Sequence, residues 1–207
     1  MGTAWPGHFN KPLALRAYEN IKAVGMPEWS EDDITLAKAL QKEIGADVTG
    51  LPEDVMPMRE PPSPDELTGG GSDDVGDIAW VAPTIFMLYP SNIPNLPGHN
   101  WANAVSMATP IAHKGIVAGA KAHAMTMIDL FTDPSLLKAV DSYFTDVQTK
   151  DIQYESLLRE QDEPQIHLNE GIMAQYREKM RQFYYNPEKY DTYLEQLGID
   201  YPTVKAE

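Results

Sequence analysis

Residues 104–131 carry the strongest helical pattern in the sequence, so any fold of this chain must accommodate one long helix. Small residues at 118–120, 122 and 124 would let this helix approach a sheet closely. Pro110 is expected in its first turn or at a kink, because proline cannot donate a helical hydrogen bond. The apolar residues that recur at helical spacing are Val117, Ala120, Ala124, Met127, Ile128 and Phe131.

Capping residues predict further helices on both sides of this one. Ser30 and Asp133 are N-cap candidates, and Pro12 and Pro134 suit the first turn of a helix. Residues 78–87 are rich in apolar side chains and predict a buried strand, or two strands separated at Pro83. The other expected helices cover residues 11–24, 30–45, 134–148, 169–184 and 187–197.

A Pro- and Gly-rich stretch, residues 46–71, separates the first helices from the rest of the chain. It contains five prolines and ends in three consecutive glycines. This composition is typical of a loop. A loop of this length within a domain is either functional or a linker, and the acidic segment that follows it favours a functional role.

Composition excludes several classes of protein. The 207 residues include no cysteine, so disulfides, thiolate nucleophiles and Cys-type zinc sites are absent. The formal net charge of −15 disfavours binding to nucleic acid, since no local basic patch offsets it. No run of 18 apolar residues is long enough to cross a membrane, and the N-terminus has no signal-peptide pattern. A cytoplasmic protein is therefore expected.

Two segments could carry chemistry. Asp73, Asp74 and Asp77 follow three glycines, and close-set carboxylates can bind a hard cation or orient a histidine; they could equally be a solvated acidic turn. His99 lies after a glycine and near a tryptophan, where it could be a metal ligand, a proton shuttle or simply exposed. His113 shares a helix face with apolar residues, which predicts a partly buried histidine with a satisfied ring.

The ordered series of these segments resembles a known family. The stretches GGSDDVGDIAWVAPT (70–84), PGHNW (97–101), IAHKG (111–115) and AK (120–121) are similar to the C-terminal part of M20-family metallopeptidases and amidohydrolases. Within that family they are similar to the subgroup that hydrolyses aminobenzoyl-glutamate. Further similarity at residues 10–13, 25–27 and 193–202 extends the resemblance over nearly the whole chain.

The resemblance implies an α/β fold: the C-terminal portion of an M20-type catalytic domain, helix-rich with a few strands and without the family's lid domain. Residues 1–131 would belong to that domain, and residues 132–207 would form a helical extension packed on it. It also implies a two-metal site that activates water to attack an amide carbonyl. His99 would be the metal ligand, zinc or manganese the metal, and the residues that shape the site would be Asp74, Asp77, Gly98 and His113.

The family's other metal ligands and its general base lie in an N-terminal half with no counterpart here, so no catalytic residue is assigned to this chain. We expect the C-terminal segment of an amidohydrolase for an N-acyl or aminobenzoyl amino acid amide, inactive without that half. A split enzyme, a truncated gene and a reused fragment all fit. The partner would be the complementary half or a second copy. The alternatives are a non-catalytic binding or assembly module, and an unrelated hydrolase with its own site around Asp73, Asp74 and His99.

Overall fold

The computed structural model describes residues 5–58 and 74–204, and the regular secondary structure in these ranges is helical, with no β-strand. The helix-rich part of the expected fold class is therefore found, and the expected strands are not among the described residues. The chain divides into two units, residues 1–157 and residues 158–207. The division into domains at 131/132 that the resemblance implies stays a prediction.

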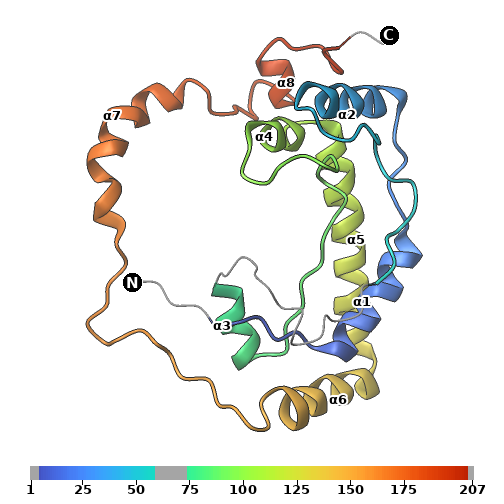
Figure 1. Ribbon diagram of the computed structural model, residues 1–207, viewed down its shortest axis with the longest axis vertical. Helices are drawn as coiled ribbons and strands as arrows, with labels where there is room; N and C mark the ends of the chain where they lie inside the picture. Colours follow the sequence, from blue (N-terminus) through green and yellow to red (C-terminus); the bar gives the residue numbers. More distant parts are fainter. Residues whose placement is uncertain (1–4, 59–73, 205–207) are drawn as a thin grey trace. The chain divides into compact units, whose positions relative to one another are not determined.

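Three helices form the frame of the first unit. α1 (Lys11–Val24) and α5 (Pro110–Thr132) lie side by side, and α6 (Pro134–Tyr143) packs against both (Figure 1). Buried Leu13 of α1 packs with Leu136 and Val140 of α6. A π-helical turn, η2 (Phe144–Gln148), continues α6.

Polar contacts fix the register between α1 and its neighbours. Asn20 on α1 donates to Thr126 Oγ1 at 3.1 Å and to Asp129 Oδ2 at 2.8 Å on α5. Asn10, fully buried, caps α1 by accepting from Leu13 N, and its Nδ2 donates to the side chain of Gln148 at 2.8 Å. Because buried polar groups are costly without partners, these bonds admit few other arrangements of the helices.

The N-cap candidates Ser30 and Asp133, and Pro12 for the first turn of α1, correctly predict where three helices begin. α1 begins one residue after Asn10, with Pro12 in its first turn, and α6 begins at Pro134 after the N-cap Asp133. α2 (Glu31–Glu43) begins with a capping box between Ser30 and Asp33. The expected helix over 134–148 ends as an α-helix at Tyr143, because its last five residues form η2.

The strand expected at residues 78–87 is wrong over its first half. Residues 74–81 form a helix, α3 (Asp74–Val81), and residues 83–89 form no regular element. Gly76, Ala79 and Trp80 are the buried residues, and their three- and four-residue spacing is helical rather than alternating. Asp74 and Asp77 lie in the first turn, where carboxylates favour the helix dipole.

The long helix expected over residues 104–131 is two helices. α4 (Trp101–Met107) ends before Thr109, and α5 starts at Pro110, so the proline opens a new helix. Its expected apolar stripe is exposed: Val117 is 54% and Phe131 82% accessible. The buried side of α5 consists instead of Ile111, Ala112, Gly115, Gly119, Ala122 and Thr126.

Gln41 holds two loops onto α2. Its side chain is fully buried, and Nε2 donates to Gly50 O at 3.2 Å and to Pro94 O at 3.0 Å. Its Oε1 accepts from Gly50 N at 2.9 Å. One amide therefore ties the loop after α2 and the loop before α4 to the same point.

Replacing Gln41 by leucine, which has a similar volume, should lower the free energy of unfolding by about 2–3 kcal/mol, because it leaves the buried N–H and carbonyl of Gly50 and the partly buried carbonyl of Pro94 without this partner. Chemical denaturation measures this loss. The control is Glu43→Leu, a change at a nearby exposed position, which should alter the free energy of unfolding by less than about 0.5 kcal/mol. A Gln41→Leu variant as stable as the parent would show that water replaces these bonds.

The second unit carries a 3₁₀ turn, η3 (Ile166–Asn169), followed by α7 (Glu170–Arg181) and α8 (Tyr193–Gln196). The helix expected at 169–184 is thus found with slightly shorter bounds, and the one at 187–197 is reduced to a single turn. None of these three elements has a buried residue. Tyr185 Oη donates to Tyr190 O, and Tyr193 Oη donates to Phe183 O.

No helix in the described ranges is both long and apolar enough to span a lipid bilayer.

Candidate functional site

His99 lies in an exposed turn immediately before α4. Its φ of +53° places it in the left-handed region, which L residues seldom occupy and in which histidine is among the enriched types. Asn100 follows as the N-cap of α4 and accepts a hydrogen bond from Ala102 N at 2.9 Å. The helix start thus fixes the backbone next to an imidazole that faces solvent.

Gly98 and Asp74 are also exposed. A Cβ built on Gly98 meets no atom within 4 Å, so the fold leaves free space beside this residue. Asp74 is the first residue of α3. Asp73, which the sequence groups with Asp74, and residues 59–71, the second half of the Pro- and Gly-rich stretch, lie outside the described residues.

Asp77 is bound within the fold rather than left open. It accepts a hydrogen bond from Trp5 N at 3.2 Å, and its Oδ1 accepts one from Tyr154 Oη at 3.0 Å. The bond to the Asp77 carboxylate raises the pKa of the Tyr154 phenol, with a further contribution from burial, because the ionised phenolate would lose that bond and lie beside a negative charge. The Tyr154 hydroxyl therefore stays protonated, and its hydrogen bond to Asp77 ties the chain at residue 154 to α3.

Aromatic rings surround this pair. Trp5 lies with its ring centroid 5.2 Å from that of Trp80 and 5.6 Å from that of Tyr154. Trp80 Nε1 donates to Pro6 O at 2.7 Å, and His8 packs against the Trp80 ring at 5.2 Å. Asp77 thus anchors a cluster of aromatic residues drawn from three separate parts of the chain.

His113 is exposed on α5, which corrects the expected partly buried histidine. The residues that share its face, Ile116 and Val117, are 48% and 54% accessible. The same turn of helix buries Ile111, Ala112 and Gly115 on its other side. Helical spacing does not identify the buried face here, because apolar residues lie on both sides of α5.

The described residues do not by themselves complete a metal site. No three His, Asp or Glu side chains within residues 5–58 and 74–204 come together as a possible ligand group. Nor does any hydrogen bond in these ranges join His99 to Asp74, Asp77 or His113. A structural or catalytic zinc needs at least three protein ligands, so His99 can supply one of them at most.

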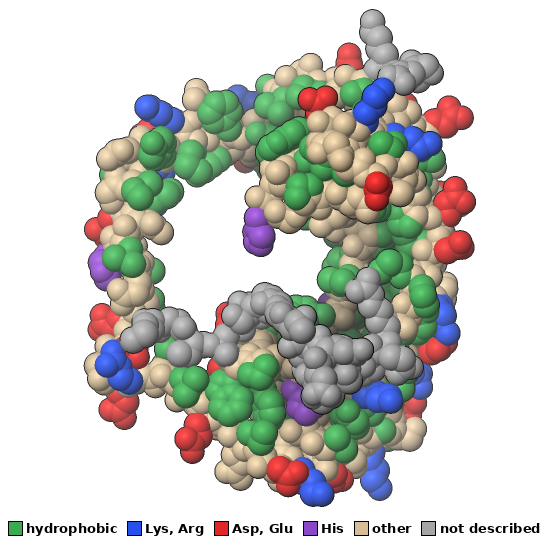
Figure 2. Space-filling view, viewed as in Figure 1, with side chains coloured by type: hydrophobic (Ala, Val, Ile, Leu, Met, Phe, Trp, Pro, Cys, Tyr) green, Lys and Arg blue, Asp and Glu red, His purple; other side chains and the backbone are tan. Residues whose placement is uncertain are grey.

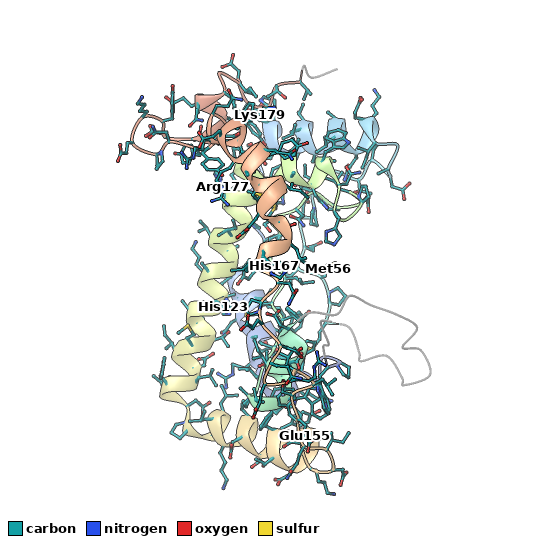
Figure 3. The ribbon with its side chains drawn as sticks, turned by 90° about the vertical axis from the view of Figure 1, so that its left-hand side faces the viewer. Met56, His123, Glu155, His167, Arg177 and Lys179 are labelled. Atoms are coloured by element: carbon teal, nitrogen blue, oxygen red, sulfur yellow. The ribbon has the colours of Figure 1, made fainter. Side chains whose placement is uncertain are left out.

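The structure contains two polar side-chain pairs that the sequence does not predict. Tyr89 Oη lies 2.7 Å from Nδ1 of His123, an exposed residue of α5 that is labelled in Figure 3. Lys114 Nζ donates to fully buried Asp33 at 2.6 Å and to Glu28 O at 3.0 Å. The partners are 34 and 81 residues apart in the chain, and no local spacing indicates either pair.

Comparison with family models finds none that matches this chain, and no solved structure matches it significantly. Among curated proteins, one subunit of the p-aminobenzoyl-glutamate hydrolase of Escherichia coli (strain K12) is 27% identical over 150 residues. That stretch covers 62% of this chain and 31% of the relative. The chain is thus similar to a hydrolase subunit over most of its own length, and it spans about a third of the length of that relative.

Proposed function

We propose that this chain is part of an amidohydrolase and contributes one metal ligand, His99, to a site completed by residues outside it. The observation that carries the proposal is the 27% identity over 150 residues to a subunit of p-aminobenzoyl-glutamate hydrolase. The reaction in the assembled enzyme is hydrolysis of an aminobenzoyl or N-acyl amino acid amide. The fold would be the C-terminal portion of an M20-type catalytic domain.

The geometry of His99 supports its role. Its imidazole is exposed on a turn whose backbone is fixed by the start of α4, so it can bind a metal ion without rearrangement of the helix. Asp77 is held by Trp5 and Tyr154 and acts as a structural anchor near the start of α3. The remaining ligands and the general base belong to the part of the enzyme outside this chain, and the metal is zinc or manganese.

The partner in this proposal is a polypeptide that corresponds to the rest of the relative. The relative's name describes a subunit of a hydrolase, and 31% of its length matches this chain. A chain that supplies one ligand binds a divalent cation weakly, because zinc sites need three or more protein ligands. We therefore expect neither stable metal binding nor turnover from the chain alone.

Hydrolysis of p-aminobenzoyl-glutamate tests the proposal. The chain is mixed with a polypeptide that carries the part of the E. coli relative outside the matched stretch, in the presence of zinc or manganese. The mixture should hydrolyse the amide, and His99→Ala should lower the rate by about 100-fold or more, as expected for loss of a metal ligand.

His167→Ala is the matched control, since His167 is another exposed histidine and has no assigned role. It should leave the rate unchanged. A mixture in which His99→Ala is as active as the parent would remove His99 from the site. Turnover by the chain alone would instead favour a separate hydrolase site within it.

A non-catalytic assembly module is the second candidate. It is favoured by the apolar side chains that the first unit exposes, which reach the surface over α3 and α4 in Figure 2. These include Ile78, Val81, Trp101, Val105 and Met107. Exposed apolar surface of this kind marks an interaction site. A complemented mixture that assembles stably yet never hydrolyses the amide would support this candidate.

A further inference from the structure

The loop that carries His99 has an uncommon backbone. We define the His99 loop as residues 92–100, which end where α4 begins. Of the non-glycine residues that the structure describes, three have a positive φ, and two of them lie in this loop: Asn95 at +63° and His99 at +53°. Residues with a Cβ seldom adopt this conformation, and it persists only where the surrounding structure holds it. The contacts that hold the loop therefore also decide where the His99 imidazole lies.

Side-chain amides hold the first half of the His99 loop to α2 and to the loop that follows α2 (Figure 1). Asn95 Nδ2 donates to Asp47 O at 3.0 Å and to Thr49 Oγ1 at 3.1 Å. Gln41 Nε2, on α2, donates to Pro94 O at 3.0 Å. Two consecutive residues of the His99 loop are thus bonded to the same neighbouring part of the chain.

The first turn of α4 holds the second half of the loop. Asn103 Nδ2 donates to Pro97 O at 2.9 Å, two residues before His99. Directly after His99, Asn100 Oδ1 accepts a hydrogen bond from Ala102 N at 2.9 Å. The backbone is therefore bonded to the same helix turn on both sides of His99.

The bonds made by Asn95 and Asn103 lie at the surface, whereas Gln41 is fully buried. An exposed hydrogen bond contributes little to the free energy of unfolding, because water competes for both partners. The buried amide of Gln41 supports the fold, as argued above. The two exposed amides act locally instead, by restricting the backbone of the His99 loop.

We propose that Asn95 and Asn103 are positioning residues for His99, because they fix the backbone from which its imidazole reaches the metal ion of the assembled hydrolase. This inference rests on the proposed function of His99 as a metal ligand and extends it to two residues that act through the loop. Groups that orient a metal ligand raise metal affinity by about 10- to 100-fold.

Backbone dynamics of the chain alone give the first test. The double variant Asn95→Gly with Asn103→Asp removes both donors. Glycine tolerates the positive φ at position 95, and aspartate keeps the shape of asparagine and suits the first turn of a helix. Nitrogen-15 relaxation should give order parameters of about 0.85 for residues 98–100 in the parent and below about 0.6 in the double variant. The melting temperature should change by less than about 4 °C, so the loss of order would not come from unfolding.

Asn92→Ala is the matched control, since Asn92 is exposed in the same loop and its side chain makes no hydrogen bond with the described residues. It should leave the order parameters of residues 98–100 unchanged. Values that stay near 0.85 in the double variant would overturn the proposal, because the loop would then be held without these amides.

Metal affinity gives the second test, with the chain mixed with the polypeptide that carries the rest of the E. coli relative. The double variant should raise the dissociation constant for zinc by about 10-fold or more, and Asn92→Ala should leave it unchanged. Loss of zinc in His99→Ala, together with parental affinity in the double variant, would overturn the positioning role alone. Retention of zinc in His99→Ala would overturn the ligand role of His99, and the positioning role with it.

Discussion

Replacing Asp33 by alanine is expected to lower the free energy of unfolding by about 3–5 kcal/mol, more than any other single substitution proposed for this chain. Asp33 is fully buried, accepts a hydrogen bond from Ser30 N at 2.9 Å, and accepts one from Lys114 Nζ at 2.6 Å. Its removal ends the capping box of α2 and leaves the Lys114 ammonium without its carboxylate. The effect therefore combines a lost cap with a broken ion pair between α2 and α5.

Asp32→Ala is the matched control, because Asp32 lies in the same helical turn and is exposed. It should cost only the dipole contribution, about 0.5 kcal/mol. Asp33→Asn separates the two roles, since asparagine can keep the cap but has no charge for Lys114. Urea denaturation measures all three variants, and a loss below about 1 kcal/mol for Asp33→Ala would show that solvent readily replaces the buried pair.

Replacing Gly115 by alanine should lower the free energy of unfolding by about 2–3 kcal/mol, even though alanine is the better helix former. A Cβ at this position would clash with the carbonyl oxygen of Pro90 and lie 2.5 Å from its carbonyl carbon. Both are backbone atoms, so the clash is relieved only by moving the 89–91 segment away from α5. The glycine is thus required by close approach and not by helix geometry.

Replacing Gly171 by alanine should have the opposite effect on stability. Gly171 lies in α7, and a Cβ built there meets nothing within 4 Å. Alanine has the higher helix propensity, so it should stabilise the helical state of α7 by about 0.5–1 kcal/mol. Thermal unfolding followed by circular dichroism compares the two variants. An unchanged melting temperature for Gly115→Ala would mean that residues 89–91 are not held against α5 in solution.

The sequence predicted the helices whose ends are marked by capping chemistry. Ser30 with Asp33, and Asp133 with Pro134, place helix starts through local hydrogen bonds, and such bonds depend only on neighbouring residues. α3 was missed because it has only eight residues, and a short apolar run fits a strand as well as a helix. Its burial depends on Trp5 and Tyr154, which lie far away in the chain.

The face of α5 could not be predicted from periodicity, because both sides of the helix carry apolar residues. The buried side is the one with Gly115 and Gly119, where the main chain at Pro90 and the ring of Tyr89 come close. The large apolar side chains of α5 recur at more regular helical spacing than the small buried ones, yet these large side chains are exposed. Close packing of backbone on small residues decided the orientation.

The sequence identifies single candidate residues of the site, but it does not show which of them are in contact. The sequence singled out His99 as a candidate, and the structure adds its exposure and its left-handed backbone. It could not show that Asp77 is bound by Tyr154, because that contact joins residues 77 apart. Site residues joined by tertiary contacts become visible only when the fold is known.

Metal content tests the proposal that His99 is a metal ligand. The chain is mixed with a polypeptide that carries the part of the E. coli relative outside the matched stretch, in the presence of zinc or manganese, then dialysed and analysed for metal, with either His99 or His99→Ala. We expect bound metal to be retained with His99 and to fall by at least half with His99→Ala, while His167→Ala retains it. Equal metal in the His99 and His99→Ala mixtures would show that His99 is not a ligand.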